Sequence, residues 1–214
     1  MEGLSEEIRV RPASKASTAK KSLDGGRARD REVIEAAVNL FWEKGYSATS
    51  VQDVADALGM LKGSLYYYID SKGDLLKKIF EDSHAEVRAI AEAAVALELP
   101  SIERLQVFIE RYADWSLLHL RRASLYAREW RHADPELRKL MLAQRQYYDQ
   151  VVMTLIEGAK NEGAADRELD TKLATFFILS AVAALPDWYR PSTAKNAQSV
   201  ARGYAELALR IVTA

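Results

Sequence analysis

The sequence predicts an all-α protein in which short N-terminal helices precede a larger helical bundle, about nine helices in total. Apolar residues recur three and four positions apart along most of the 214-residue chain, which is helical spacing. No stretch of useful length alternates apolar and polar residues as a half-buried strand does. With 49% hydrophobic and 29% charged residues, the chain can bury a sizeable core.

Start and stop signals divide the chain into helices. Ser50 and Asp53 form a capping-box pattern, and Asp134 before Pro135 is a typical helix start. Gly45 and Gly59 end their helices. The expected helices span residues 30–44, 51–58, 62–69 and 71–97, then 102–120, 124–132, 135 to 158 or 163, 170–185 and 194–212.

The composition excludes several classes of protein. The chain has no cysteine, which rules out disulfide scaffolds, thiolate metal sites and cysteine nucleophiles and fits a cytoplasmic protein. Residues 1–31 contain no apolar segment of the kind found in signal peptides. The longest uncharged run, Leu173–Pro186, has 14 residues, fewer than the ~20 that cross a bilayer, so no membrane partner is expected.

Basic residues are concentrated near the N-terminus, although the net charge of the chain is only −1. Residues 9–31 hold eight Lys or Arg and two acidic residues, and they are rich in Ser, Ala and Gly. We therefore expect residues 1–26 to form a disordered basic arm. Such an arm either keeps the protein soluble or contacts the phosphates or minor groove of DNA.

The second and third expected helices are joined by Gly59-Met60-Leu61, which suits a helix-turn-helix. In that motif the second helix lies in the major groove of DNA. Here it reads Lys62-Gly63-Ser64-Leu65-Tyr66-Tyr67-Tyr68-Ile69, and at least two of the tyrosines must be exposed. Exposed tyrosines contact phosphates, sugars and thymine methyl groups. Packing on neighbouring helices explains any single tyrosine but not all three.

From Glu32 to Phe80 the chain resembles the TetR family of bacterial transcriptional repressors. The matching residues are Ala37, Phe41, Gly45-Tyr46, Thr49-Ser50-Val51, Val54-Ala55, Leu58-Gly59, the run Lys62–Tyr66, Ser71-Lys72 and Leu75-Leu76. Their combined spacing is highly specific. Two features depart from the pattern: Leu61 stands where many members have a small hydroxyl residue, and Tyr67 and Tyr68 replace a common histidine.

The resemblance implies a DNA-binding domain over residues 27–75 and a ligand-binding and dimerisation domain over residues 76–214. It implies a homodimer that represses transcription from a palindromic operator in double-stranded DNA until a small-molecule effector binds. A phosphate at Lys72 would also meet the N-terminus of a helix. The residues carried over as DNA contacts are Ser50, Gln52, Lys62, Gly63, Ser64, Tyr66, Tyr67, Tyr68 and Lys72.

The last two expected helices carry apolar stripes that suit a two-fold interface. Monomer core is the alternative, and it must account for part of the penultimate helix, which is apolar all round. The resemblance implies a four-helix bundle between two copies, with the recognition helices ~34 Å apart. The stripe of the final helix consists of Ala197, Val200, Ala201, Tyr204, Leu207, Ala208 and Ile211.

Aromatic residues are dense between Tyr112 and Arg190, which indicates an apolar pocket between helices. Core filling explains any one of them, whereas a nearby arginine can hold a carboxylate or phosphate. The segment 187–191, Asp-Trp-Tyr-Arg-Pro, looks like one in acyl-CoA-sensing members, which favours a hydrophobic or amphipathic anionic effector such as an acyl-CoA. The candidate ligand contacts are Trp115, Tyr126, Arg128, Trp130, Tyr147, Phe177, Trp188 and Arg190.

No recognisable catalytic or cofactor motif accompanies these features. The sequence has no Gly-rich phosphate loop, no HExxH and no GxSxG, and its three histidines are widely spaced. We therefore expect no cofactor, no metal and no enzymatic activity. Two other interpretations stay open: a helical adaptor that binds protein, and an all-α enzyme that uses the aromatic cavity.

Overall fold

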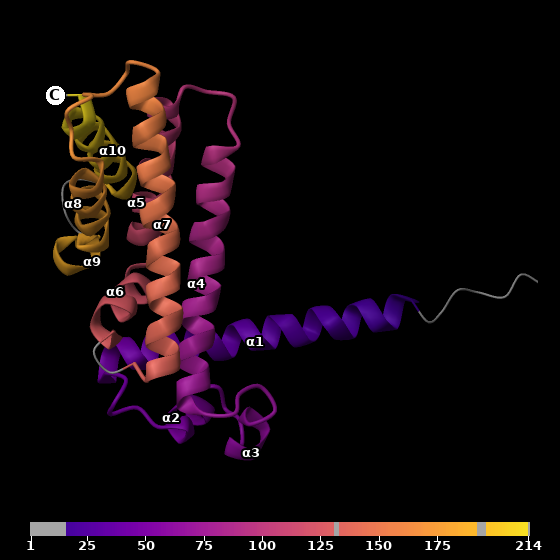
Figure 1. The fold of residues 1–214 in the computed structure, drawn as a ribbon. Coiled ribbons are helices and arrows are strands. Elements are labelled where there is room, and N and C mark those ends of the chain that lie inside the picture. Colours follow the sequence, from indigo (N-terminus) through magenta and orange to yellow (C-terminus); the bar gives the residue numbers. More distant parts are fainter. Residues whose placement is uncertain (1–15, 131–132, 192–195, 214) are drawn as a thin grey trace, which may run out of the picture.

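The computed structural model describes residues 16–130, 133–191 and 196–213, with side chains from Ala28 onward (Figure 1). Every regular element in these residues is an α-helix, which confirms the predicted fold class. The helices are α1 (Ala16–Lys44), α2 (Val51–Ala57), α3 (Lys62–Leu65), α4 (Lys72–Val95), α5 (Ser101–Leu118), α6 (Leu120–Glu129), α7 (Pro135–Asn161), α8 (Thr171–Ala183), α9 (Leu185–Trp188) and α10 (Ala197–Thr213).

Helix α1 begins earlier than expected. Residues 16–26, predicted to belong to a disordered arm, are helical, and the first half of α1 extends away from the rest of the molecule (Figure 1). This segment contains Ala, Lys and Leu, which favour helix, but it lacks the apolar stripe on which the sequence prediction relied. Residues 1–15 of the predicted arm lie outside the described residues.

The helix-turn-helix has the expected order but a shorter second helix. The Ser50–Asp53 capping box is present at the start of α2. Gly59 has a φ of +61°, a conformation that favours glycine, and it turns the chain toward α3. Helix α3 ends at Leu65 rather than Ile69, and its N-cap residue, Leu61, makes no side-chain capping bond. An uncapped helix has fewer bonds to hold its first turn.

Helix α4 belongs to two hydrophobic cores. Its first half, with Leu75, Leu76 and Ile79, packs with α1, α2 and α3 in the core of the helix-turn-helix. Its second half, with Ala91 and Ala94, packs in the core of the upper bundle. The predicted domain boundary at residue 75 therefore falls inside a continuous helix rather than at a linker.

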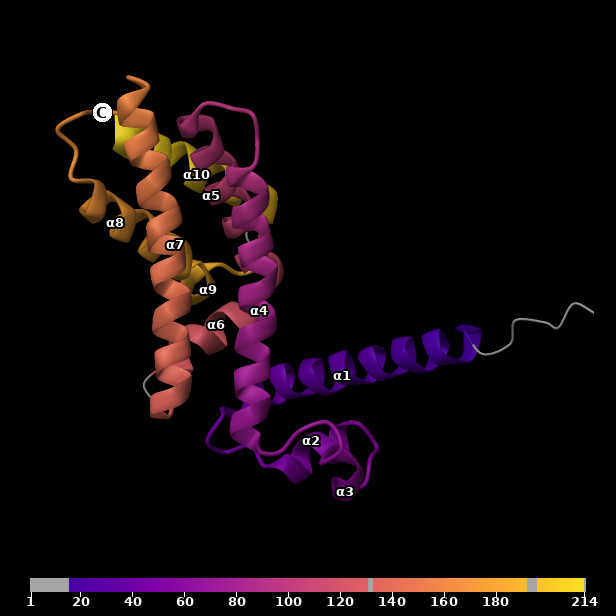
Figure 2. The ribbon, with the colours of Figure 1, turned by 45° about the vertical axis from the view of Figure 1, so that its right-hand side comes forward.

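The remaining helices form the upper bundle, and α6 and the start of α7 also pack in the lower core through Leu125, Leu137 and Met141. In Figure 2, α4 and α7 run lengthwise beside each other, with α6 beside their lower halves. Helices α5 and α6 form a bent pair around His119, where the sequence predicted a wider gap. Asp134 caps α7 as expected, and α10 packs on α5. No helix in the described part of the chain is long and apolar enough to cross a membrane.

Candidate DNA interface and ligand cavity

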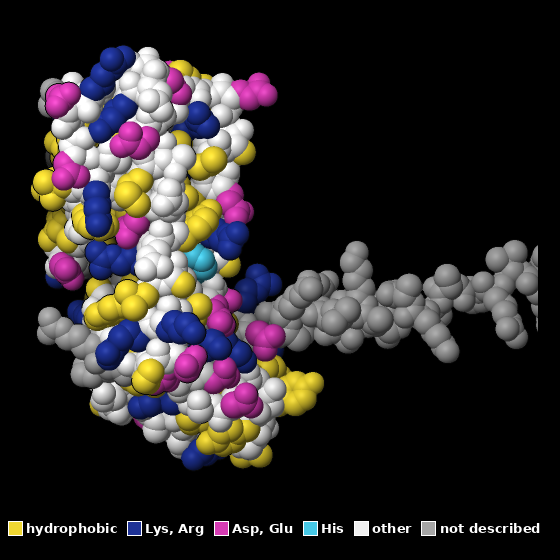
Figure 3. Space-filling view, viewed as in Figure 1, with side chains coloured by type: hydrophobic (Ala, Val, Ile, Leu, Met, Phe, Trp, Pro, Cys, Tyr) yellow, Lys and Arg dark blue, Asp and Glu magenta, His cyan; other side chains and the backbone are white. Residues whose placement is uncertain are grey.

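The lower end of the molecule presents exposed hydrophobic side chains around the helix-turn-helix (Figure 3). The exposed fraction is 87% for Tyr67, 46% for Tyr66 and 81% for Leu61. Tyr68 is half-buried; its ring meets that of Tyr67 edge-on, with ring centroids 5.3 Å apart. The prediction that at least two of the three tyrosines are exposed is confirmed.

Leu65 fixes the orientation of α3. Its side chain is fully buried in the core of the helix-turn-helix, so the opposite face of α3 points to solvent. Lys62, Gly63 and Ser64 are all exposed there. A Cβ atom at Gly63 would meet nothing within 4 Å, so glycine leaves open space on the surface of α3. This space permits close approach of a partner such as a DNA backbone.

Ser50 and Gln52 are exposed on α2, but both side chains make bonds within the protein. The hydroxyl of Ser50 accepts a hydrogen bond from the Asp53 backbone N–H as a helix cap. Gln52 Nε2 donates to Asp56 Oδ1 at 2.7 Å. Hydrogen bonds from Lys44 and Ser50 hold the pKa of Asp53 well below its usual range, so its carboxylate keeps the start of α2 in place.

Lys72 does not point to solvent as a free phosphate contact. Its Nζ donates to the backbone oxygens of Tyr46 at 2.9 Å, Ser47 at 3.4 Å and Thr49 at 2.9 Å. It also lies 4.5 Å from the centroid of the Tyr46 ring. An ammonium group has three N–H donors, and here all three have acceptors. The structure thus gives Lys72 a role in fixing the loop between α1 and α2 that the sequence did not indicate.

A cavity of about 460 Å³ lies among α4, α5, α6, α7, α8 and α9. Most of its wall is apolar or aromatic, as is usual for sites that bind small molecules. Helix α4 contributes four lining residues, so the helix that enters the helix-turn-helix also forms a wall of the cavity. The largest lining side chains are Phe80, Tyr112, Trp115, Tyr126, Trp130 and Tyr148.

Two polar partners meet inside this wall. The hydroxyl of Tyr148 lies 2.7 Å from His84 Nδ1, which joins α7 to α4. Burial lowers the pKa of His84, and the nearby positive charge of Arg88 lowers that pKa further. Burial also raises the pKa of Tyr112 to about 12, so this phenol stays neutral. The described residues contain no cluster of His, Cys, Asp and Glu that could hold a metal ion.

Arg122 is the buried charge of the cavity wall. It is 8% exposed; its Nη2 donates to Glu35 on α1, and its Nη1 lies 3.6 Å from Glu86 on α4. Its Nε atom is buried and has no hydrogen-bond partner in the described residues. Gln144 on α7 is 4% exposed, and its Oε1 atom is unpartnered in the same way. Arg122 therefore contacts the cavity, α1 and α4 at once.

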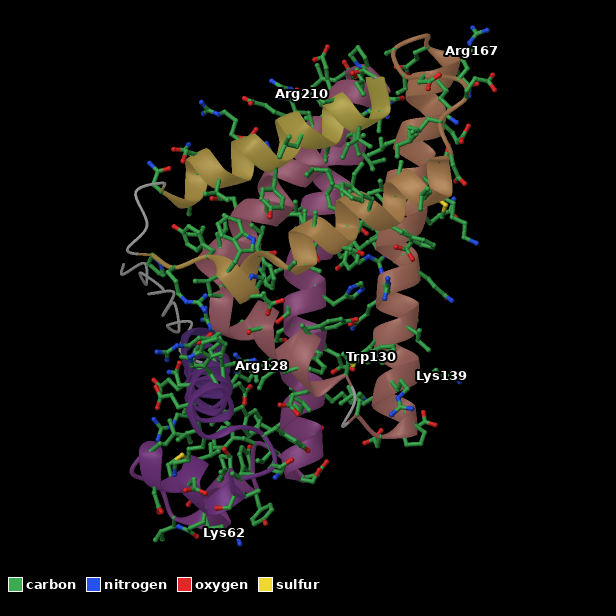
Figure 4. All side chains as sticks on the ribbon, turned by 90° about the vertical axis from the view of Figure 1, so that its left-hand side faces the viewer. Lys62, Arg128, Trp130, Lys139, Arg167 and Arg210 are labelled. Atoms are coloured by element: carbon green, nitrogen blue, oxygen red, sulfur yellow. The ribbon has the colours of Figure 1, made fainter. Side chains whose placement is uncertain are left out.

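Three of the predicted ligand contacts line the cavity, namely Trp115, Tyr126 and Trp130. The other five do not line it. Figure 4 shows Arg128 on the side of α6 that faces α1, and its guanidinium lies 4.4 Å from the Trp42 ring centroid. The residues outside the cavity wall are Arg128, Tyr147, Phe177, Trp188 and Arg190.

Local contacts explain these placements. Trp188 stacks on Tyr204, and Arg190 donates to the backbone oxygen of Tyr189 at 2.8 Å. Phe177 is 62% exposed and lies in a second, shallower hollow on α8. These residues were selected because they lie near other aromatic residues along the chain. Such proximity does not show which face of a helix each residue occupies.

Helix periodicity contained a signal for the residues that the sequence analysis missed. Arg122 lies four residues before Tyr126 and eight before Trp130, so all three share one face of α6. Gln144 and Tyr148 are related in the same way on α7. Arg122 and Gln144 each lie four residues before an aromatic residue that lines the cavity.

Comparison with known proteins matches both halves of the chain. A family model described as "Bacterial regulatory proteins, tetR family" matches residues 33–79, and one described as "Tetracyclin repressor-like, C-terminal domain" matches residues 98–212. The HTH-type transcriptional repressor KstR2 of Rhodococcus jostii (strain RHA1) is 28% identical over 190 residues, which cover 86% of this chain and 91% of that protein.

Solved structures agree with these matches. The TetR family regulator PfmR from Thermus thermophilus has a TM-score of 0.76 and 32% identity, covering 83% of this chain and 97% of that one. The ketosteroid transcriptional regulator KstR2 of Mycobacterium tuberculosis has a TM-score of 0.80 and 26% identity, covering 87% of this chain and 95% of that one. The chain therefore belongs to the TetR family of bacterial regulatory proteins and is a helix-turn-helix regulator of transcription.

Proposed function

We propose that the protein is a homodimeric repressor that binds a palindromic operator and releases it when an effector fills the cavity. One observation carries this proposal: α4 lies in the helix-turn-helix core, forms part of the cavity wall, and continues into the upper core. A ligand that favours a different position of α4 must therefore also move the recognition helix. The relative KstR2 of Rhodococcus jostii is described as a repressor, which supports the same direction of control.

DNA contact is proposed for the exposed face of α3 and the turn after it. Lys62 and Ser64 reach phosphates, Tyr66 and Tyr67 contact sugars and base edges, and Gly63 lets the backbone approach. Tyr68 is half-buried and orients Tyr67, while Ser50 and Gln52 flank the site from α2. Lys72 supports the site by holding the preceding loop and does not itself touch DNA.

Dimerisation is proposed through α8 and α10. Leu173 and Phe177 on α8 and Leu207 on α10 are 67%, 62% and 57% exposed, although all three are large and apolar. Val200, Ala201 and Ala208 of the predicted stripe are buried within the same chain instead, so only part of that stripe is available to a second copy. A two-fold axis through this face would present two copies of α3 to successive major grooves.

The effector is proposed to be a small molecule with an apolar body that fills the aromatic cavity. A steroid-like or acyl body fits the lining, and KstR2 of Mycobacterium tuberculosis is described as a ketosteroid regulator. The anionic part of an amphipathic effector such as an acyl-CoA would lie toward solvent, beside exposed Arg145 at the cavity wall. We propose regulation without catalysis, and a location in the cytoplasm with the chromosome.

The first test is a selection of genomic fragments by the purified protein at roughly physiological salt, followed by sequencing of the bound DNA. An enriched palindrome with half-sites ~10 base pairs apart supports a two-fold DNA-binding dimer. The genes beside it would indicate the metabolic class of the effector. No enrichment at any salt concentration overturns the proposed function.

A further inference from the structure

The cavity has an unpartnered hydrogen-bond donor and an unpartnered acceptor in its wall. These are Arg122 Nε on α6 and Gln144 Oε1 on α7, and both residues are more than nine-tenths buried. A buried polar atom without a partner costs free energy, and a ligand that supplies the partner recovers it. Both atoms have almost no accessible surface, so a ligand that bonds them must turn the two side chains toward the cavity, and its polar groups must match a donor and an acceptor.

The charges around the cavity favour a neutral group at this place. Arg122 is already neutralised by Glu35 and Glu86. An anion beside it would be desolvated without an unpaired positive charge to stabilise it. The four charged lining residues also cancel, since they are Arg122, Arg145, Asp149 and Asp187.

We propose that Arg122 and Gln144 bind a neutral group of the effector, which accepts a hydrogen bond from Arg122 and donates one to Gln144. A carboxamide, or a hydroxyl beside a carbonyl, has this pattern. This inference rests on the proposed function, because it assigns the polar contacts of the effector in that same cavity. Any charged part of the effector lies away from these two residues.

Arg122 also connects the ligand to the DNA-binding domain. Its guanidinium is buried, whereas the carboxylates of Glu35 and Glu86 are about half exposed and can exchange it for water. A ligand acceptor at Nε draws the rigid, planar guanidinium toward the cavity and away from Glu35. One of the contacts between α1 and α6 is then weakened, and the position of α1 relative to the upper bundle is less constrained.

The recognition step is tested with three probes of matched shape: octanamide, nonan-2-one and octanoate. Quenching of the fluorescence of Trp115 and Trp130, which line the cavity, reports binding to the full-length protein. The amide should bind roughly fivefold more tightly than the ketone, as one hydrogen bond provides, and roughly tenfold more tightly than the carboxylate.

Two variants separate this contact from general effects on α7. Gln144→Leu should abolish the preference for amide over ketone, whereas Gln146→Leu, at an exposed position of the same helix, should keep it. Octanoate binding as tightly as octanamide, failure of all three probes to bind, or an unchanged preference in Gln144→Leu would overturn the proposal.

The role of the contact between Arg122 and Glu35 is tested by measuring binding, without ligand, to the operator that the genomic-fragment selection identifies. Glu35→Gln should weaken operator binding about tenfold, because α1 loses its contact with Arg122. Glu32→Gln is the matched control, since Glu32 is an exposed acid of α1 that pairs with Arg29 of the same helix. Equal effects of the two substitutions would overturn the role of Arg122. The probe ranking needs no DNA, so its failure is distinguishable from failure of the protein to select an operator.

Discussion

Leu65, the last residue of α3, and Tyr66, which follows it, have opposite surroundings. Leu65 is buried, whereas Tyr66 is 46% exposed. We predict that Tyr66→Ala weakens operator binding at least tenfold, or about 1.4 kcal/mol, without changing the melting temperature. Leu65→Ala should instead lower stability by about 2–5 kcal/mol because it leaves a cavity in the core. Gel-shift titration and thermal melting give both quantities, and unchanged affinity in Tyr66→Ala would remove this residue from the contact set.

Lys72 distinguishes a structural cation from a phosphate contact. Lys72→Met removes three hydrogen bonds to backbone oxygens and should lower the free energy of unfolding by about 1–3 kcal/mol. The slope of log affinity against log salt should stay the same. A phosphate contact would show the reverse pattern, with unchanged melting and a slope smaller by about 0.9.

His84 makes stability depend on pH. Its pKa lies below the ordinary value of about 6.5 in the folded protein, so the unfolded chain binds more protons as the pH falls past that value. The protein should therefore lose stability as the pH falls from about 7.5 through the ordinary value of about 6.5. His84→Gln removes this titration, so its melting temperature should fall less over the same interval. An equal fall in both proteins would contradict the placement of His84.

The candidate site was only partly predictable at this scale. The exposed tyrosines followed from crowding on a short helix, and Trp115, Tyr126 and Trp130 followed from their aromatic character. The use of Lys72 depends on carbonyl groups more than 20 residues earlier in the chain, which local spacing does not reveal. Arg122 was missed because its partners lie on two other helices.

At the scale of the element, α3 is a short helix of four residues without a side-chain cap. Leu61 has the extended backbone conformation of an N-cap, with φ −69° and ψ 140°, but a side chain that cannot accept a hydrogen bond. We predict that Leu61→Thr stabilises the protein by about 0.5–1 kcal/mol through a new cap. Leu118→Thr, at another exposed leucine, serves as the control in thermal melting and should not stabilise the protein.

Helix ends were predicted well where the sequence has a capping residue. Ser50, Ser71 and Asp134 each cap the helix expected to follow them. The short interval between α5 and α6 has no side-chain cap, and there the expected bounds differ from those observed. Apolar periodicity therefore located the helices, whereas side-chain hydrogen bonds located their ends.

At the scale of the whole molecule, the exposed apolar face of α8 and α10 is the proposed dimer interface. Phe177→Glu should convert the dimer to monomers, because an interfacial charge would be buried without a partner. Light scattering after size-exclusion chromatography measures the mass, and operator affinity should fall at least tenfold because each half-site is then bound alone. Leu118→Glu, on α5, is the control. A Phe177→Glu protein that remained dimeric would exclude this face.

Because α4 is one continuous helix, a small tilt of it at the cavity produces a displacement at the helix-turn-helix. Its 24 residues extend about 36 Å, and about 22 Å of that length lies between Val87 at the cavity and Lys72 at the helix-turn-helix. A tilt of about 5° around Val87 therefore displaces the lower end by roughly 2 Å, and in opposite senses in two copies. Displacements of this size exceed the tolerance of hydrogen bonds. If the effector tilts α4 as proposed, an angular change of about 5° is therefore sufficient to disturb the contacts with the operator.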